Sequence, residues 1–198
     1  MSTAQSYHHG NVPQATIEAA QALLQEMPAE QISMRELARA AGVSHGAPYK
    51  HFGDRHGFLV ALAARCMADF LDTQQRALDG APRGDRLLRV GEAYVHHGTA
   101  HPHAFALIFD TAISPPGHPP DLLGPLIDHH SQLLREAITD ALDAGRLPSQ
   151  IPVQTLASAL WSQAHGLTEL VITGRIPPTA IEPVLATFLD HATARPTG

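Results

Sequence analysis

The sequence predicts an all-α protein: an N-terminal three-helix head that contains a helix-turn-helix, then a C-terminal helical bundle, about nine helices in total. Apolar residues recur at three- and four-residue spacing through most of the chain. No stretch alternates apolar and polar residues like a half-buried strand, and no Asn-Gly or Asp-Gly pair joins two such stretches. Polar clusters rich in glycine and proline, at 79–85 and 114–121, separate the helical segments.

Composition narrows the class of protein. The chain has 198 residues, of which 44% are hydrophobic and 16% are charged, and this balance predicts a folded chain. Its formal net charge of -6 argues against bulk attraction to nucleic acid or anionic lipid. The first residues lack the features of a signal peptide, and no apolar run is long enough to span a membrane. We therefore expect a cytoplasmic protein. Its single cysteine, Cys66, excludes an internal disulfide and is expected to be buried and inert.

Local signals place the helices of the head. Ser33 and Glu36 form an S-x-x-E capping box, so a helix is predicted to start at about residue 34 and to stop at Gly42. Ser44 is predicted to cap a very short helix that runs to about His51. The other predicted helices cover residues 12–27, 54–78, 86–100, 102–113, 122–144, 153–173 and 183–194.

Two short helices joined by the three-residue turn 42–44 form a helix-turn-helix. The second helix is expected to expose small side chains, which let its backbone approach a groove, together with donors to phosphate such as Tyr49 and Lys50. Residues 33–55 also carry an excess of two positive charges, against the acidic balance of the whole chain. The predicted DNA-contacting residues are Ser33, Arg35, Ser44, His45, Gly46, Ala47, Tyr49, Lys50, His51 and Arg55.

The segment "MRELARAAGVSHGAPYKHFGDRHGFLVAL", preceded by "YHHGN" and a helix, resembles the tetracycline-repressor (TetR) family of one-component bacterial regulators. The likeness covers residues 7–62 and depends on the run Tyr49, His51, Phe52, Arg55 and Leu59. It implies a homodimeric, ligand-responsive regulator, most simply a repressor, that binds double-stranded operator DNA. It also implies a DNA-binding domain over 1–55 and a ligand-binding and dimerisation domain over 56–198, joined through the helix at about 54–78.

A second motif lies in "ALWSQAHGLTEL", at residues 159–170. Its residues Trp161, His165 and Gly166 resemble the W-H-G signature of one class of C-terminal domain in the same family. The likeness implies a small-molecule effector in the helical body, and the aromatic side chains there favour a largely uncharged organic molecule. The candidate pocket residues are Tyr94, His97, Phe105, Phe109, Trp161 and His165. The alternative for each aromatic residue is plain core, and for His165 a core histidine bonded to a neighbour.

The helix predicted at 153–173 has very few charges, so it is expected to be buried nearly all round. In a body of this size a partner subunit is the expected cover, with burial inside one chain as the alternative. The candidate interface residues are Leu160, Leu167, Leu170, Val171, Leu185, Phe188 and Leu189.

Two other classes of function fit the sequence less well. The chain has 14 histidines, and the closely spaced His97, His101 and His103 favour an alternative as a His-rich metal-binding or metal-responsive protein. However, Pro102 interrupts that group, and we predict no metal site and no cofactor. The sequence contains no G-x-S-x-G, phosphate loop or H-E-x-x-H motif, so an enzyme is not expected.

Overall fold

The computed structural model describes residues 12–147 and 150–193, and it describes side chains up to residue 187. These residues form nine α-helices and three short 3-10 helices, without a strand, which confirms the predicted fold class. The α-helices are α1 (Val12–Leu23), α2 (Met34–Ala40), α3 (Ala47–Phe52), α4 (Arg55–Leu78), α5 (Arg86–Ala100), α6 (Pro102–Ile108), α7 (Gly124–Asp143), α8 (Val153–Ile172) and α9 (Ile181–Thr193). The 3-10 helices are η1 (Ala29–Gln31), η2 (Arg83–Asp85) and η3 (Pro178–Ala180).

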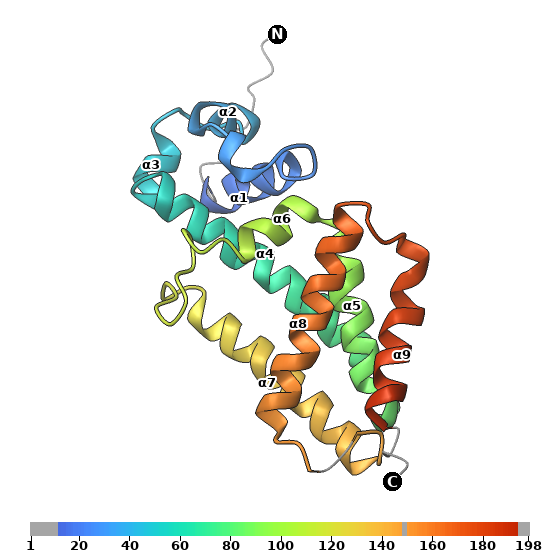
Figure 1. Cartoon of the computed structure of the whole chain (residues 1–198). Coiled ribbons are helices and arrows are strands. Elements are labelled where there is room, and N and C mark those ends of the chain that lie inside the picture. Colours follow the sequence, from blue (N-terminus) through green and yellow to red (C-terminus); the bar gives the residue numbers. More distant parts are fainter. Residues whose placement is uncertain (1–11, 148–149, 194–198) are drawn as a thin grey trace.

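The molecule has a small head, α1 to α3, at one end and a longer helical body, α5 to α9, at the other (Figure 1). Helix α4 begins beside α3 and runs diagonally into the body, where it packs against α5, α6 and α7. In the head, α1 packs on α2, α3 and α4. One long helix therefore belongs to both parts of the molecule.

Two of the predicted cap signals of the head, Ser33 and Gly42, are confirmed, whereas Ser44 does not cap α3, whose N-cap is Gly46. The backbone N–H of Glu36 donates to Ser33 Oγ over 3.1 Å at the start of α2. Gly42 takes the left-handed conformation, with φ of 66°, just after α2 ends. Helix α3 starts at residue 47, later than predicted, because the Ala47 N–H bonds to the Ser44 carbonyl in a turn that precedes the helix.

The body departs from the prediction at two helix ends. Helix α6 stops at residue 108, whereas the sequence predicted helix to 113. Asp110 explains the stop, because its side chain accepts from the Ala112 N–H at 2.8 Å and its carbonyl accepts from Ile113, which closes a turn. Helix α9 begins before Pro183, because η3 already turns the chain into it.

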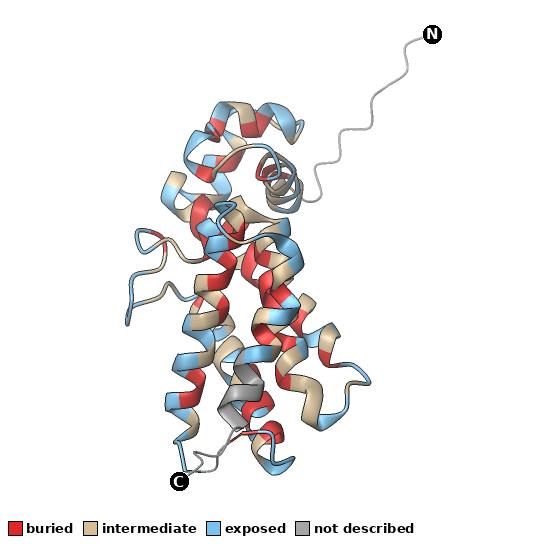
Figure 2. Ribbon diagram, turned by 45° about the vertical axis from the view of Figure 1, so that its right-hand side comes forward, coloured by how far each residue is buried: buried red, intermediate tan, exposed pale blue. Residues whose placement is uncertain are grey.

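Buried side chains run without a break from the head into the body (Figure 2). The core includes Leu37 of α2, Phe58 and Phe70 of α4, and Val95 of α5, all with at most 1% of their surface exposed. A second buried cluster, around Leu133 and Ile138, fills the end of the body far from the head. The shared core gives a physical route by which a change in the body can move the head.

Cys66 belongs to this core, as predicted. Burial raises the pKa of its thiol to about 12, so the thiol stays protonated and unreactive at neutral pH. None of the described helices is long and apolar enough to cross a membrane.

Gly98 of α5 marks a close approach of three helices. A Cβ at this position would lie 2.6 Å from Thr168 Cγ2 of α8 and 2.8 Å from Phe105 Cδ2 of α6. Overpacking of this kind costs about 1–3 kcal/mol, and the better helix propensity of alanine offsets about 1 kcal/mol of it. We expect Gly98→Ala to lower the thermal midpoint by a few degrees, measured by circular dichroism.

Gly166→Ala is the matched control for this change. Gly166 also lies inside a helix, α8, but a Cβ there meets no atom within 4 Å. The control is expected to leave the midpoint unchanged or slightly raised. If the two variants unfold at the same midpoint, the close approach of α5, α6 and α8 does not require a glycine at position 98.

Candidate DNA-binding face and effector cavity

Helix α3 lies at the outer edge of the head, beside α2 and the start of α4 (Figure 1). Its inner side is held by Pro48, which is buried, and by Phe52, whose ring meets Phe58 of α4 edge-on at 5.6 Å. Pro48 occupies the first turn of the helix, where a missing N–H leaves no helical hydrogen bond unmade. This packing turns the other side of α3 to solvent.

The outward side carries most of the predicted DNA-contacting residues. Tyr49 has 43% of its surface exposed, and its ring meets that of His45 edge-on at 6.2 Å. Ala47 is half-buried at the start of the helix. The exposed members of the set are Ser33, Arg35, Ser44, His45, Gly46, Tyr49, Lys50 and His51. Hydroxyl, ammonium and imidazole donors next to small side chains suit a surface that lies against a polyanion.

Lys50 is the only lysine in the sequence. It is exposed in the last turn of α3 and makes no ion pair with any described carboxylate. Its ammonium group therefore remains available to an external anion.

The sequence predicted that Arg55 contacts DNA, but its side chain bonds to the backbone of the head instead. Its Nη2 donates to the carbonyl of Ala29 at 2.9 Å and to that of Glu30 at 3.1 Å. The side chain thus ties the 3-10 turn η1 to the start of α4. Arg55 fixes the geometry of the head, and this nitrogen is not free to contact phosphate.

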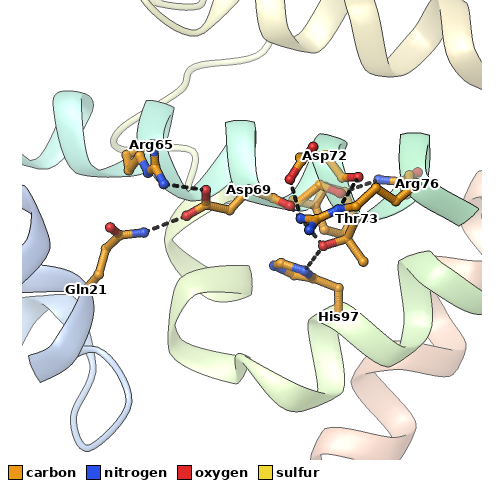
Figure 3. Close-up of polar contacts among 9 residues, drawn as sticks. Gln21, Arg65, Asp69, Asp72, Thr73, Arg76 and His97 are labelled. Atoms are coloured by element: carbon orange, nitrogen blue, oxygen red, sulfur yellow. Dashed lines mark hydrogen bonds and ion pairs between the residues drawn. The ribbon is translucent and has the colours of Figure 1, made fainter.

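A polar junction joins the head to the body (Figure 3). Gln21 of α1 donates to Asp69 Oδ2 of α4 at 2.6 Å, while Arg65 forms an ion pair with the other oxygen of Asp69 at 2.9 Å. One turn further along α4, Thr73 bonds to His97 Nδ1 of α5 at 2.9 Å. The orientation of α1 is therefore linked to α4, and α4 to α5.

His97 lies at this junction and not in the central cavity, which corrects one predicted pocket residue. It lines a small cavity of about 90 Å³ together with Gln21, Asp69 and His101. Burial and the neighbouring His101 lower its pKa to about 4, so the ring is neutral at pH 7. Among the described residues, no three histidine, cysteine or carboxylate side chains come close enough to hold a metal ion, so the structure does not support the metal-binding alternative.

Three of the other candidates form a hydrogen-bonded chain in the body. Trp161 Nε1 of α8 donates to the Tyr94 hydroxyl of α5 at 3.1 Å, and that hydroxyl lies 2.9 Å from His165 Nδ1. Burial lowers the pKa of His165, so its ring is neutral and Nδ1 can accept the proton of the tyrosine. His165 is thus a histidine bonded to a neighbour, the alternative left open by the sequence.

The largest cavity has a volume of about 590 Å³ and lies between α7, α8 and the segment that follows α6. Its lining includes Phe109 and Trp161, with several prolines of residues 115–119. A smaller inner cavity of about 40 Å³, lined in part by Tyr94, shares the walls His130, Leu134 and Trp161 with it. Phe105 is almost fully buried and lines neither cavity, because it packs against the rings of Phe70 and Tyr94.

Two family descriptions match this chain. Residues 17–62 match "Bacterial regulatory proteins, tetR family", and residues 87–194, more than half of the chain, match "Tetracyclin repressor-like, C-terminal domain". The chain belongs to the tetracycline-repressor family. It is accordingly a DNA-binding transcriptional regulator. The first match, over residues 17–62, covers part of α1, all of α2 and α3, and the start of α4.

Solved structures of other proteins share the fold of this TetR-family chain. A Rhodococcus sp. RHA1 protein of unknown function is 28% identical, with a TM-score of 0.81 over 96% of this chain and 97% of its own. The TetR regulator PfmR of Thermus thermophilus is 23% identical, with a TM-score of 0.64 and coverage of 91% and 99%. FadR of Bacillus subtilis, in complex with stearoyl-CoA, is 16% identical, with a TM-score of 0.68 and coverage of 92% and 99%. No curated protein matches the sequence.

Three of the seven predicted dimer residues of this TetR-family chain are core residues. Leu167, Val171 and Leu185 are each less than 9% exposed in a single chain, because α8 and α9 both pack on α5. Leu160 is half-buried and lines the inner cavity, while Leu170 is 40% exposed. Leu167, Val171 and Leu185 are therefore buried within one chain, which was the alternative to cover by a partner subunit. The side chains of Phe188 and Leu189 lie outside the described residues.

Sequence reasoning missed two residues of this body. His130 of α7 lies in the wall between the two cavities, and burial lowers its pKa to about 4. Gln74 of α4 lines the inner cavity and is fully buried. A glutamine on the apolar side of a predicted helix was the available signal, since glutamine is rarely buried without a partner.

Proposed function

We propose that this TetR-family regulator is a homodimeric, ligand-responsive transcriptional repressor of the cytoplasm. Two copies of α3 enter successive major grooves of a pseudo-palindromic operator, about 34–36 Å apart. The observation that carries the proposal is the outward side of α3, where the exposed Tyr49 and the unpaired Lys50 lie beside small residues. Residues 1–55 are the DNA-binding domain, and residues 56–198 bind ligand and dimerise.

The helical body supports a role for a small effector. The cavity of about 590 Å³ is of the size that holds small molecules in proteins, and its lining is mostly apolar. FadR of Bacillus subtilis, which shares the fold, is complexed with stearoyl-CoA, so this architecture accommodates a ligand with a long apolar part. An effector that binds better to one arrangement of the two heads shifts the population toward it.

Helix α4 is the element that transmits this shift. Met67 of α4 lines the large cavity, while Asp69, two residues on, accepts the hydrogen bond from Gln21 of the head. A movement of α4 at the cavity therefore reaches α1 through a direct polar contact. The same helix carries the shared core into the head through Phe58.

The test uses the wild-type protein and DNA from the region upstream of its own gene. Gel retardation in excess competitor DNA is expected to show a complex with that fragment and none with a shuffled fragment of the same composition. Light scattering is expected to give two chains in the free protein. A monomer that retards neither fragment would exclude the proposed function.

A further inference from the structure

The inner cavity lies among the helices of the body and is only partly closed to solvent, since Trp161 of its lining is 43% exposed. Its lining comes from α4, α5, α7, α8 and α9. A cavity needs about 10–15 Å³ to hold one water, so its volume of about 40 Å³ has room for a few atoms. It adjoins the large cavity along Trp161, His130 and Leu134. The two cavities are therefore neighbours that share part of their walls.

Gln74 gives the inner cavity its chemical character. The side chain has none of its surface exposed, and its Nε2 is turned toward the Phe70 carbonyl at 3.3 Å. Its Oε1 accepts no hydrogen bond from any described residue. Because the nitrogen faces Phe70, the oxygen is the end of the amide left for a partner that enters from outside the protein. Leaving a buried acceptor unpaired is unfavourable, so a donor placed there gains affinity.

The neighbouring polar groups do not meet this need. The Tyr94 hydroxyl is engaged by Trp161 Nε1 and by His165 Nδ1, and it makes no hydrogen bond to Gln74. No aspartate, glutamate, lysine or arginine among the described residues lines the inner cavity, and the ring of His130 is neutral at pH 7 because burial lowers its pKa to about 4. An ionised group would therefore lose its hydration there without a counter-charge. A neutral donor fits.

We propose that the inner cavity is a specificity subsite for a neutral hydrogen-bond donor, a hydroxyl or an amide N–H, at the end of an otherwise apolar effector. Gln74 Oε1 accepts the hydrogen bond, and the large cavity takes the apolar remainder. This inference rests on the proposed function, because it describes the effector of the same regulator. It predicts selection between molecules that differ by a single donor.

Trp161 provides the measurement, since it is the only tryptophan in the sequence and lies in the wall shared by both cavities. Its fluorescence is followed during titration with 1-decanol and with decyl methyl ether, which has a similar shape without the donor. The wild-type protein is expected to bind the alcohol about tenfold more tightly, the effect of one buried hydrogen bond.

Gln74→Leu removes the acceptor. The affinities of this variant for the two probes are expected to agree within about twofold, because apolar contacts alone then bind each probe. Gln74→Met, with a longer unbranched side chain, serves if the leucine variant does not fold. The matched control is Gln75→Leu, which changes the neighbouring glutamine of α4, an exposed residue that lines neither cavity. It is expected to keep the tenfold preference for the alcohol.

Three results would overturn the inference. They are equal affinity of the wild type for both probes, no response of Trp161 to either probe, and a preference for the alcohol that persists in both Gln74 variants. Gel retardation of the wild-type protein without any probe separates this inference from the proposed function. Normal DNA binding with no preference for the alcohol removes the subsite alone, whereas loss of DNA binding by the wild type removes the regulator.

Discussion

Lys50→Ala is expected to weaken operator binding by at least about a hundredfold, which abolishes retention in a gel-shift assay. A homodimer presents two copies of this ammonium group, and hydrogen bonds to charged groups contribute about 1.5–3 kcal/mol each. The salt dependence is expected to change as well. Each phosphate that the protein neutralises contributes about 0.9 to the slope of log K against log salt concentration, so the slope falls by about 2 for the dimer.

Arg146→Ala is the control for this change, because it removes the same charge from an exposed position after α7, far from α3. It is expected to leave both affinity and salt slope unchanged. Tyr49→Ala is expected to weaken binding as Lys50→Ala does, with the dimer intact by light scattering. If Lys50→Ala binds the operator like the wild type, the DNA face is not the outward side of α3.

Phe70→Ala is expected to destabilise the protein by about 3–5 kcal/mol, the usual range for loss of a buried phenylalanine. Phe70 is fully buried on α4, and its ring contacts those of Tyr94 at 4.9 Å and Phe105 at 6.2 Å. The truncated side chain leaves a cavity where α4, α5 and α6 meet. For a chain of this size the thermal midpoint should fall by about 10 °C or more.

Leu122→Ala provides the comparison, because Leu122 is 58% exposed and its truncation should change the unfolding free energy by less than about 0.5 kcal/mol. Chemical denaturation of both variants gives the two free energies directly. A Phe70→Ala protein as stable as the Leu122→Ala protein would mean that the aromatic cluster is not packed as the structure shows.

The head was predictable from the sequence because its signals are local. The Ser33 cap, the left-handed Gly42 and the Asp54 cap, which accepts from the Gly57 N–H at 2.8 Å, each involve residues within a few positions of one another. The start of α3 was misplaced because Pro48, four residues after Ser44, has no N–H to give the Ser44 carbonyl, which accepts from Ala47 in a turn instead. The role of Arg55 could not be predicted, since its partners lie 25 and 26 residues away.

In the body the sequence predicted the helices but not which neighbour covers each face. The sparse charge of α8 predicted burial nearly all round, but within the chain only one side of α8 is buried, against α5 and α7. Trp161 and Leu170 of the same helix remain exposed. Tyr94, Phe109 and Trp161 were predicted as pocket residues and line the cavities. His97 lies three residues after Tyr94 on α5, and both rings contact Phe70, yet the two side chains line different cavities. Helical spacing alone could not separate their positions.

The reactivity of Lys50 tests most directly whether the outward side of α3 contacts DNA. As the only lysine in the sequence, it is the one side-chain amine that an acetylating reagent can modify, and mass spectrometry reports its extent of reaction. With a saturating operator fragment its acetylation rate is expected to fall at least about tenfold, because phosphate engages the ammonium group and keeps it protonated. An unchanged rate on fully bound DNA would contradict the placement of α3 against the duplex.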